Sequence, residues 1–427
     1  MTYDNLKITI QQAEDILFNL FQIKGKASVL PGEVDFNFRI KVENSEGYIL
    51  KISRPDEDEG YLDFQQKLLQ YVEANGQNLI APKVIKDKDG NAISEITDAF
   101  GKQRKVRLLS WVSGRVWSAV NPQLNDLRYS LGEQCGLLTQ ALQGFKHPEA
   151  ERDFVWDVAQ ASWTKAHTHL FENEEKDIVE HFQNKFENTQ DTYSKLRKAV
   201  VHNDANDNNV IVSSQLINPK VQAAIDYGDA IHTQIINDVA IACAYAIMNH
   251  NDALDAALPI VKGYHKTFPL QEEELAHLYN AIAMRLVISV TKSAINKIEE
   301  PNNEYLLISE KPDWEVLKKQ HAMLNDSKFL EKIAGHVIEL DSHAVQALEV
   351  SKIKEQAEVV HYALSTPYGA PFIGETTLLD AANGYQSNSS EPALMDLLSD
   401  FLKYGQHKQV PLFNVLDEIS EELDNSC

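Results

Sequence analysis

The feature that most constrains this chain is a pair of polar motifs separated by two short apolar runs. The first motif, HNDANDNN, spans residues 202–209 and leads into the apolar run VIV. The second motif, DYGD, spans residues 226–229 and follows an apolar run that begins at Val221. Apolar runs of this length, separated by turn residues such as Asn218 and Pro219, are typical of a β-hairpin. Such a hairpin would bring the end of the first motif and the start of the second to one point.

The residue types in these motifs indicate phosphoryl transfer. That reaction needs a carboxylate at the acceptor hydroxyl, a side-chain oxygen on a metal ion, and a second carboxylate between metal and phosphates. We predict that Asp204 is the catalytic carboxylate and that Asn209 and Asp226 hold Mg²⁺, because the D-x-x-x-x-N spacing is that of a kinase catalytic loop. Asn and Asp also crowd into ordinary turns. The D-Y-G triplet after an apolar strand favours the kinase interpretation.

Further polar residues near these motifs are candidates for support or substrate binding. His202 is expected to support the loop by hydrogen bonding, because the position of the base belongs to Asp204. Asp229 either faces an ammonium group of the substrate or hydrogen-bonds within its own turn. Arg285 either grips a substrate carboxylate or joins a structural ion pair, and the ion pair is favoured. Asp238 is expected to begin a helix and anchor the catalytic loop.

Composition and charge narrow the class of protein. The chain has 427 residues and a formal net charge of -23. This charge disfavours nucleic acid or an anionic membrane as a partner and favours a cationic small substrate. The longest apolar run, residues 239–248, is too short to span a bilayer, and the N-terminus has no basic and apolar leader, so we expect a cytoplasmic protein. Three scattered cysteines indicate neither a disulfide framework nor a zinc site. The oligomeric state stays open.

The remaining patterns predict an α+β protein with two lobes. Alternating apolar residues in 27–53 predict a β-hairpin, a helical pattern follows at 62–72, and strand-like pieces occupy 92–96 and 105–109. From Asn125 onward helical patterns dominate, apart from the hairpin of the two motifs. We therefore expect a small β-rich N-terminal lobe and a larger, mainly helical C-terminal lobe, as in protein kinases.

The lobes set the expected domain boundaries. The nucleotide-binding lobe is placed at residues 1–109, and the helical lobe with the catalytic loop and substrate site at 110–345. Residues 109–114 would form the hinge. Residues 346–427 combine short helical patterns with loops rich in Pro, Gly and Ser, so they are expected to be an accessory segment without chemistry of its own.

The nucleotide site is expected in the first lobe and its hinge. Lys51 lies in the second strand of the hairpin, where a kinase lysine contacts the α and β phosphates. Its predicted ion-pair partner is Asp63 on the following helix, with Glu59 as the second choice. Backbone groups of Leu109 and Trp111 at the hinge would bind the base.

Two features distinguish the chain from a protein kinase. The segment expected to cover the phosphates, residues 30–36, has a single glycine and no G-x-G-x-x-G pattern. Asp229 leads almost directly into the helical pattern 235–248, which leaves no activation segment and no A-P-E triplet. These departures favour a kinase that acts on small molecules.

The chain resembles the aminoglycoside phosphotransferase superfamily, and within it the hydroxylysine kinase branch. The resemblance covers roughly residues 10–330 and rests on segments that include EVDFNFRI, VHNDANDNNVIV, AIDYGDAIH and FKHPEAERDFVWD. It implies a bilobal kinase fold and transfer of the γ-phosphate of ATP or GTP to 5-hydroxy-L-lysine or a related amino alcohol. Asn203 stands where the family usually has glycine. Relatives in this branch include fusions to a phospholyase, so the segment 346–427 is either accessory or a fusion remnant.

Several alternatives stay open at this level. Homoserine, choline, ethanolamine and aminoglycosides are other hydroxyl acceptors of related kinases. A nucleotide-binding regulatory protein without catalysis is a second class, which the presence of all three phosphate-site residues disfavours. The sequence does not choose between ATP and GTP.

Overall fold

A computed structural model describes the part of the chain that carries both polar motifs. The described residues are 7–32, 35–55, 57–248, 250, 253–299 and 310–322. All of them lie in the first of two units into which the chain divides, Met1–Leu330 and Glu331–Cys427. The predicted boundary at 345 and the accessory segment 346–427 lie outside the described residues. Among the described helices, none has the length and apolar character needed to cross a bilayer.

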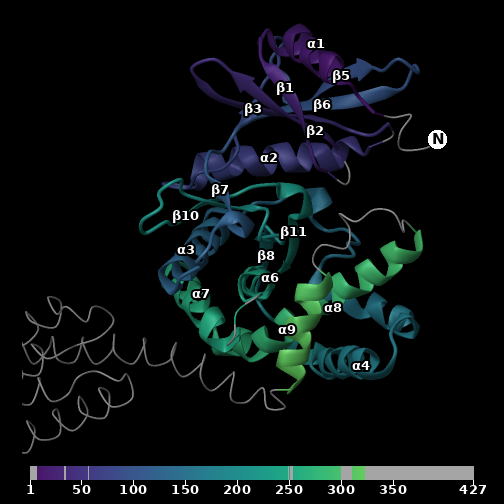
Figure 1. Ribbon diagram of the computed structural model, residues 1–427, viewed down its shortest axis with the longest axis vertical. Helices are drawn as coiled ribbons and strands as arrows, with labels where there is room; N and C mark the ends of the chain where they lie inside the picture. Colours follow the sequence, from purple (N-terminus) through teal and green to yellow (C-terminus); the bar gives the residue numbers. More distant parts are fainter. Residues whose placement is uncertain are drawn as a thin grey trace, which may run out of the picture. The chain divides into compact units, whose positions relative to one another are not determined.

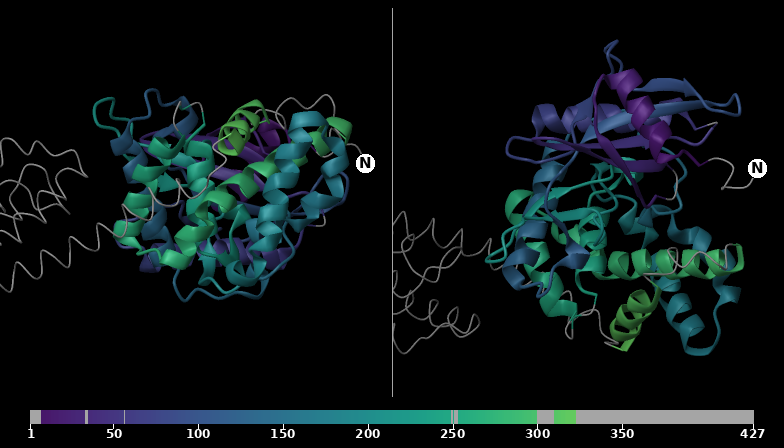
Figure 2. Two further views of the ribbon diagram at one scale, coloured as in Figure 1. Left: turned by 90° about the horizontal axis from the view of Figure 1, so that it is seen from below. Right: turned by 45° about the horizontal axis from the view of Figure 1, so that its top comes forward.

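A six-stranded antiparallel sheet forms the N-terminal lobe (Figure 1). Its strand order is β1-β2-β3-β6-β4, and β5 pairs with the other end of β6. Helices α1 and α2 cover opposite faces of the sheet, and the helical part of the chain lies on the α2 side (Figures 1 and 2). The elements are α1 (Ile10–Phe21), β1 (Lys26–Leu30), β2 (Phe36–Val42), β3 (Ser45–Ile52), α2 (Glu59–Asn75), β4 (Val84–Ile85), β5 (Ser94–Thr97) and β6 (Gln103–Ser110).

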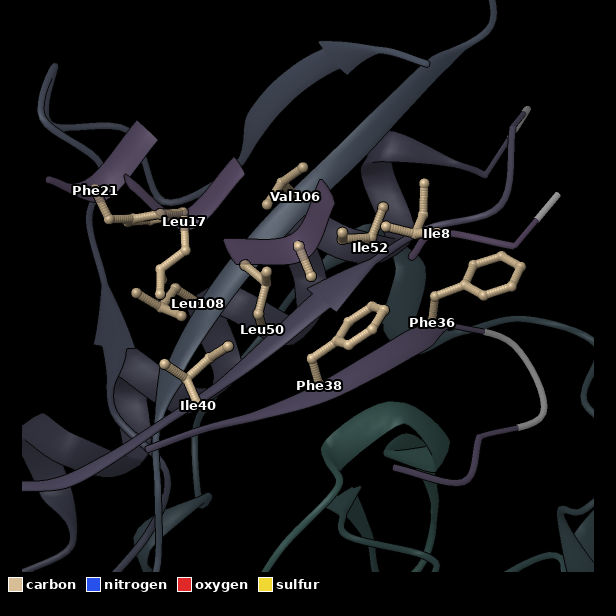
Figure 3. Packing of buried hydrophobic residues seen from close by; sticks show 11 residues of the cluster. Ile8, Leu17, Phe21, Phe36, Phe38, Ile40, Leu50, Ile52, Val106 and Leu108 are labelled. Carbon is tan, nitrogen blue, oxygen red and sulfur yellow. The ribbon is translucent and has the colours of Figure 1, made fainter. Parts of the chain in front are cut away.

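Alternation along the strands decides what each face of this sheet contacts. Phe36, Phe38 and Ile40 of β2 point toward α1 and are buried with Leu50 of β3 (Figure 3). Since successive residues of a strand point to opposite faces, Lys51 must lie on the α2 side. The apolar alternation therefore directs a charged side chain toward the space between the lobes.

Helix α2 extends past the predicted pattern 62–72 at both ends. Its first turn is capped by the side chain of Asp58, which accepts a hydrogen bond from the N–H of Tyr61 at 2.9 Å. Phe64 and Leu68 are fully buried on its inner face. The helix thus packs between the sheet and the helical lobe.

The C-terminal lobe is mainly helical, as the sequence predicts. Helix α6 is buried along its whole length, and α8 is buried over most of its length. The main elements are α3 (Asn125–Ala141), the 3-10 segment η4 (Val158–Leu170), α4 (Asn173–Asn188), α5 (Gln190–Tyr193), α6 (Ile236–Ala246), α7 (Ala253–Thr267), α8 (Glu272–Glu299) and α9 (Glu310–Ala322).

Helices α3 and α7 touch backbone to backbone. A methyl group at Gly132 of α3 would lie 1.9 Å from the carbonyl oxygen of Ile260, and one at Gly263 of α7 would lie 2.0 Å from that of Tyr129. Because no larger side chain fits at this crossing, glycine is required on both helices.

Two small antiparallel sheets carry the polar motifs. One has the order β10-β9-β7 and the other pairs β11 with β8. The first motif lies between β8 and β9, and the second lies between β10 and β11. Their elements are β7 (Arg115–Val116), β8 (Lys198–Val201), β9 (Val210–Val212), β10 (Val221–Ala224), the 3-10 turn η5 (Tyr227–Asp229) and β11 (Ile231–Gln234).

Candidate active site

The predicted hairpin joins the two polar motifs. Strands β9 and β10 are antiparallel, with Val210 opposite Ala224, and the N–H of Ile225 donates to the carbonyl of Asn209 at 2.8 Å. Asn209 and Asp226 therefore lie at the same end of the hairpin, as the sequence predicts.

The carboxylate of Asp204 is bound on both oxygens. Oδ1 lies 2.8 Å from Nη2 of Arg285, and Oδ2 accepts from the side-chain amides of Asn206 at 3.0 Å and Asn209 at 2.6 Å. Burial, together with the nearby charge of Asp229, raises the pKa of Asp204 well above its usual value, while Arg285 lowers it. A carboxylate with a raised pKa is a better proton acceptor, which suits a group facing a hydroxyl.

The side chains of His202 and Asp238 accept hydrogen bonds from the backbone of the first motif and so support this loop. His202 is 1% exposed; its Nδ1 accepts from the N–H of Asp204 at 3.3 Å, and its Nε2 lies 3.1 Å from the carbonyl oxygen of Ile225. Burial lowers the pKa of His202 to about 4, so the ring is neutral near pH 7. Asp238, in the first turn of α6, accepts from the N–H of Asn203 at 2.9 Å. Both residues make the supporting contacts that we predict.

Asn203 has the backbone conformation that glycine would adopt more easily. Its φ angle is 63°, in the left-handed region, where asparagine is better tolerated than most residues. Its side chain is fully buried, and neither polar atom has a hydrogen-bond partner. The substitution of the usual glycine is therefore accommodated by the backbone but leaves a buried amide unsatisfied.

Lys51 reaches across to the second motif. Its Nζ lies 3.3 Å from Oδ1 of Asp226 and 3.5 Å from Oδ2 of Asp35. Lys51 is the main cause that holds the pKa of Asp226 below its usual value. The side chain of Asp226 is half exposed, so an ionised carboxylate faces the space next to Lys51.

The predicted ion pair between Lys51 and helix α2 is wrong. Asp63 instead lies 2.6 Å from Nζ of Lys67, one helical turn away, and 3.2 Å from Nε2 of His147. Glu59 pairs with Lys105 at 2.5 Å. Since neither of the two predicted partners is bound to Lys51, Asp63 has no described contact that ties it to the predicted nucleotide site.

Asp35 and Arg107 are the residues that sequence reasoning missed around Lys51. Nη2 of Arg107 lies 2.5 Å from Oδ2 of Asp35, and Nη1 donates to Oε1 of Gln65 at 2.6 Å. All of these side chains are buried. The sequence gives only a weak sign of this contact. Asp35 lies an odd number of positions before the core residues Phe36 and Phe38, so alternation places its side chain on the opposite face of the sheet, which is the face of Lys51.

The structure describes the predicted hinge, and some of its backbone N–H groups already donate hydrogen bonds within the protein. The N–H of Trp111 donates to the carbonyl of Gly47 at 3.0 Å, and the N–H of Ser110 donates to that of Lys83. The guanidinium of Arg39 lies 3.9 Å from the centre of the Trp111 ring. The base-binding role of Leu109 and Trp111 stays a prediction.

Arg152 fixes the turn of the second motif. Its Nη2 lies 3.4 Å from the carbonyl oxygen of Gly228, to which the hydroxyl of Tyr61 also donates. The guanidinium lies 4.9 Å from the ring centre of Tyr61 and 4.9 Å from that of Phe154. Asp229 lies close enough to Arg152 to raise its pKa, against a larger opposite effect of burial. The two roles expected for Asp229, on an ammonium group of the substrate or within its own turn, stay predictions.

The donors present fit a magnesium ion. Asn209 uses its amide nitrogen on Asp204, which leaves its side-chain oxygen for another partner, and Asp226 offers an ionised carboxylate at the same end of the hairpin. Mg²⁺ prefers such oxygens and is held by one or two carboxylates together with phosphates and water. In the described part of the chain, no group of three or more His, Cys, Asp or Glu residues could hold a metal by itself.

Sequence comparison finds similarity to kinases that are named for small hydroxylated amino acids. Hydroxylysine kinase of Xenopus laevis is 27% identical over 349 residues, which cover 75% of this chain and 91% of that protein. Hydroxylysine kinase of Mus musculus is 25% identical over 337 residues, covering 73% and 89%. Homoserine kinase of Methylobacillus flagellatus is 27% identical over 279 residues, covering 64% and 80%.

Solved structures share the fold. A microcompartment-associated aminopropanol kinase matches with a TM-score of 0.59 at 15% identity, over 74% of this chain and 98% of that chain. Amicoumacin kinase hAmiN, in complex with AMP-PNP, Ca²⁺ and Ami, matches with a TM-score of 0.57 at 15% identity, over 74% and 96%. The bilobal kinase fold is thereby confirmed. The family model of the phosphotransferase enzyme family (APH) matches residues 26–273, more than half of the chain, and this chain therefore belongs to that family.

Proposed function

We propose that this protein transfers the γ-phosphate of a nucleoside triphosphate to a hydroxyl of a small amine-bearing molecule, with 5-hydroxy-L-lysine as the first candidate. The observation that carries the proposal is the convergence of Asp204, Asn209 and Asp226 with Lys51, which reaches Asp226 from the other lobe. Phosphoryl transfer requires these four functions at one place.

Each residue has a role in the proposed mechanism. Asp204 accepts or orients the proton of the acceptor hydroxyl, and Lys51 binds the phosphates of ATP or GTP. Asn209 and Asp226 would hold Mg²⁺, which neutralises phosphate charge when bound. Most of the rate arises from positioning and from charge neutralisation. A cytoplasmic location is part of the proposal.

The net charge of the chain and the names of the related kinases both support a substrate that carries an amine. The chain carries a net charge of -23, and Asp229 lies close to the catalytic carboxylate. The relatives named above phosphorylate hydroxylysine or homoserine, by their names, and one structural neighbour is an aminopropanol kinase. All three molecules carry an amine and a hydroxyl.

A panel of acceptors tests the proposal. Purified protein is given ATP or GTP with Mg²⁺, and turnover is measured with 5-hydroxylysine, homoserine, 1-amino-2-propanol, choline and kanamycin. We expect 5-hydroxylysine to have the highest kcat/KM, kanamycin to be a poor substrate, and affinity for the amine to fall as salt rises. Preference for homoserine would move the acceptor assignment to that amino acid. Nucleotide binding without turnover of any acceptor would favour the regulatory alternative.

Two substitutions separate chemistry from nucleotide binding. Asp204→Asn should lower turnover by about 10³-fold or more and change the affinity for Mg-nucleotide by less than about threefold, because the carboxylate acts at the hydroxyl. Asp226→Ala should instead weaken metal-dependent nucleotide binding, measured by calorimetry. Near-normal turnover of Asp204→Asn would remove this residue from the mechanism, and unchanged binding by Asp226→Ala would contradict the metal assignment.

A further inference from the structure

The carboxylate of Asp204 accepts hydrogen bonds both from residues of its own loop and from a residue outside the loop. Asn206 and Asn209 donate to Oδ2 and belong to the same loop, so they move with it. Nη2 of Arg285 lies 2.8 Å from Oδ1, and Arg285 is on α8. Among the described residues, Arg285 is the donor that ties this carboxylate to the helical lobe.

Arg285 is itself fixed in place. Its Nη1 donates to the carbonyl of Trp156 at 2.9 Å, and its Nε lies 3.3 Å from the hydroxyl of Tyr245. The guanidinium lies 4.8 Å from the ring centre of Trp156 and 5.6 Å from that of Tyr245. The residue is 2% exposed. An arginine held on every nitrogen and stacked on aromatic rings is not free to turn toward an arriving substrate.

We propose that Arg285 is a positioning residue, which holds one oxygen of Asp204 so that the carboxylate meets the acceptor hydroxyl in one orientation. The inference rests on the proposed function. An ionised carboxylate has about four acceptor positions, and three are occupied by Arg285, Asn206 and Asn209, which leaves one for the hydroxyl. Trp156, in the segment FKHPEAERDFVWD, supports the site through its backbone contact with Arg285.

The inference also limits how the acceptor is recognised. Because its guanidinium is used on Asp204 and Trp156, Arg285 does not bind a carboxylate of the substrate. Removing Arg285 should therefore affect an acceptor with a carboxylate and one without it to the same extent. This equality distinguishes positioning of Asp204 from direct binding of an amino-acid substrate.

The test compares Arg285→Lys and Arg285→Met with the full-length wild-type protein. Each variant is assayed with 5-hydroxylysine and with its decarboxylated counterpart, 1,5-diaminopentan-2-ol, and its thermal midpoint and nucleotide affinity are measured. Arg128→Met is the matched control. Arg128 is also a buried helical arginine of this lobe, and its Nε donates to the backbone carbonyl of Ala246 at 3.4 Å and not to the carboxylate of Asp204.

Positioning predicts a loss in kcat. Arg285→Met should lower kcat by about 100-fold with both acceptors, the effect of a misplaced catalytic group, and Arg285→Lys should recover part of it. KM for both acceptors and the nucleotide affinity should stay within about threefold of wild type. Arg128→Met should lower the thermal midpoint with little change in kcat. If Arg285→Met does not fold, the kcat of Arg285→Lys is compared with that of wild type instead, and the thermal midpoint of Arg285→Lys shows that this variant is folded.

Two results would overturn the inference. Wild-type kcat in a folded Arg285→Lys and Arg285→Met would remove the positioning role. A rise in KM confined to 5-hydroxylysine would make Arg285 a ligand of the substrate carboxylate. Failure of the wild-type protein to phosphorylate any acceptor would instead contradict the proposed function, from which this inference starts.

Discussion

Asn203 and Asp204 are neighbours in the chain, but their side chains differ in hydrogen bonding. Asp204 receives hydrogen bonds from Arg285 and two asparagines, whereas the buried amide of Asn203 has no partner. A buried polar group without a hydrogen bond costs free energy of folding. The motif thus gives the loop the carboxylate that we propose as catalytic and also a local source of instability.

Replacing Asn203 by glycine should stabilise the protein. The change removes an unsatisfied amide and suits the φ angle of 63°, while glycine loses more entropy on folding, for a net gain of about 1 kcal/mol. Asn203→Ala is the control, because it removes the same amide but keeps a side chain in the left-handed region. Urea unfolding should rank the glycine variant above both wild type and alanine. A glycine variant less stable than wild type would show that the amide is satisfied in solution.

His202 should make stability depend on pH. Burial lowers its pKa to about 4 from 6.5, so between these values the unfolded chain binds the proton and the folded chain does not. The contribution of neutral His202 is present above about pH 6.5 and is lost as the pH falls toward 4. Burial raises the pKa of Asp238 to about 6, which acts in the opposite direction.

A matched variant isolates this titration. Because Asp238 is present in both wild type and His202→Gln, their difference in unfolding free energy reports His202 alone. The difference should change by about 3 kcal/mol in favour of the variant between pH 7 and pH 4. Urea unfolding at several pH values measures it, and a constant difference would show that the ring is not buried neutral.

At the scale of elements, strand pairing decides what surrounds Lys51. Lys51 lies opposite Asn37 on β2 and opposite Arg107 on β6, so two cations are neighbours on one face of the sheet. Asp35 lies between them and contacts both. The anions next to Lys51 are therefore Asp35, directly before β2, and Asp226 of the second motif, and neither comes from α2.

The same elements show how far the sequence could predict this site. Alternation of apolar residues is local, so it predicts the face of Lys51 and the hairpin that joins Asn209 to Asp226. The cluster around Lys51 also depends on β6 lying next to β3, which brings Arg107 from more than fifty residues away to share Asp35 with Lys51. The contact of Arg285 with Asp204 likewise requires the packing of α8, which no local pattern shows. An ion pair for Arg285 is predictable, but its partner is not.

Neutralising Asp35 should lower the free energy of unfolding much more than neutralising Asp63. Asp35→Asn leaves Arg107 and Lys51 buried with less compensating charge, which costs about 3–5 kcal/mol of unfolding free energy. Asp63→Asn breaks a pair in which Asp63 is 40% exposed, and should cost no more than about 1 kcal/mol. Denaturant unfolding measures both. Equal losses would mean that Asp63 contributes to the cluster after all.

At the scale of the whole molecule, the site is assembled within the first unit of the chain. Lys51 and Arg285, at opposite ends of the assigned residues, both lie within Met1–Leu330. The resemblance to related kinases covers roughly the same residues, which is why the bilobal fold could be predicted. The role of residues 346–427 stays a prediction, because short helical patterns without a motif carry no chemical information.

A chain that ends at Leu340 should retain phosphoryl transfer. Every residue assigned to the chemistry precedes that point, so its kcat and thermal midpoint should resemble those of the full-length protein. Both quantities are measured on the two proteins side by side. A folded, truncated protein without turnover would show that the later residues complete the substrate site, and an unfolded one would show that they are required for stability.

The crossing of α3 and α7 has a consequence for motion. Gly132 and Gly263 bring the two backbones together, so no layer of side chains can rearrange to let one helix shift against the other. We therefore expect the pair to behave in hydrogen exchange as one cooperative unit, whose amides are exposed together or remain protected together. Any movement of the lobes on nucleotide binding should then occur at connections outside this pair, while α3 and α7 keep their position relative to each other.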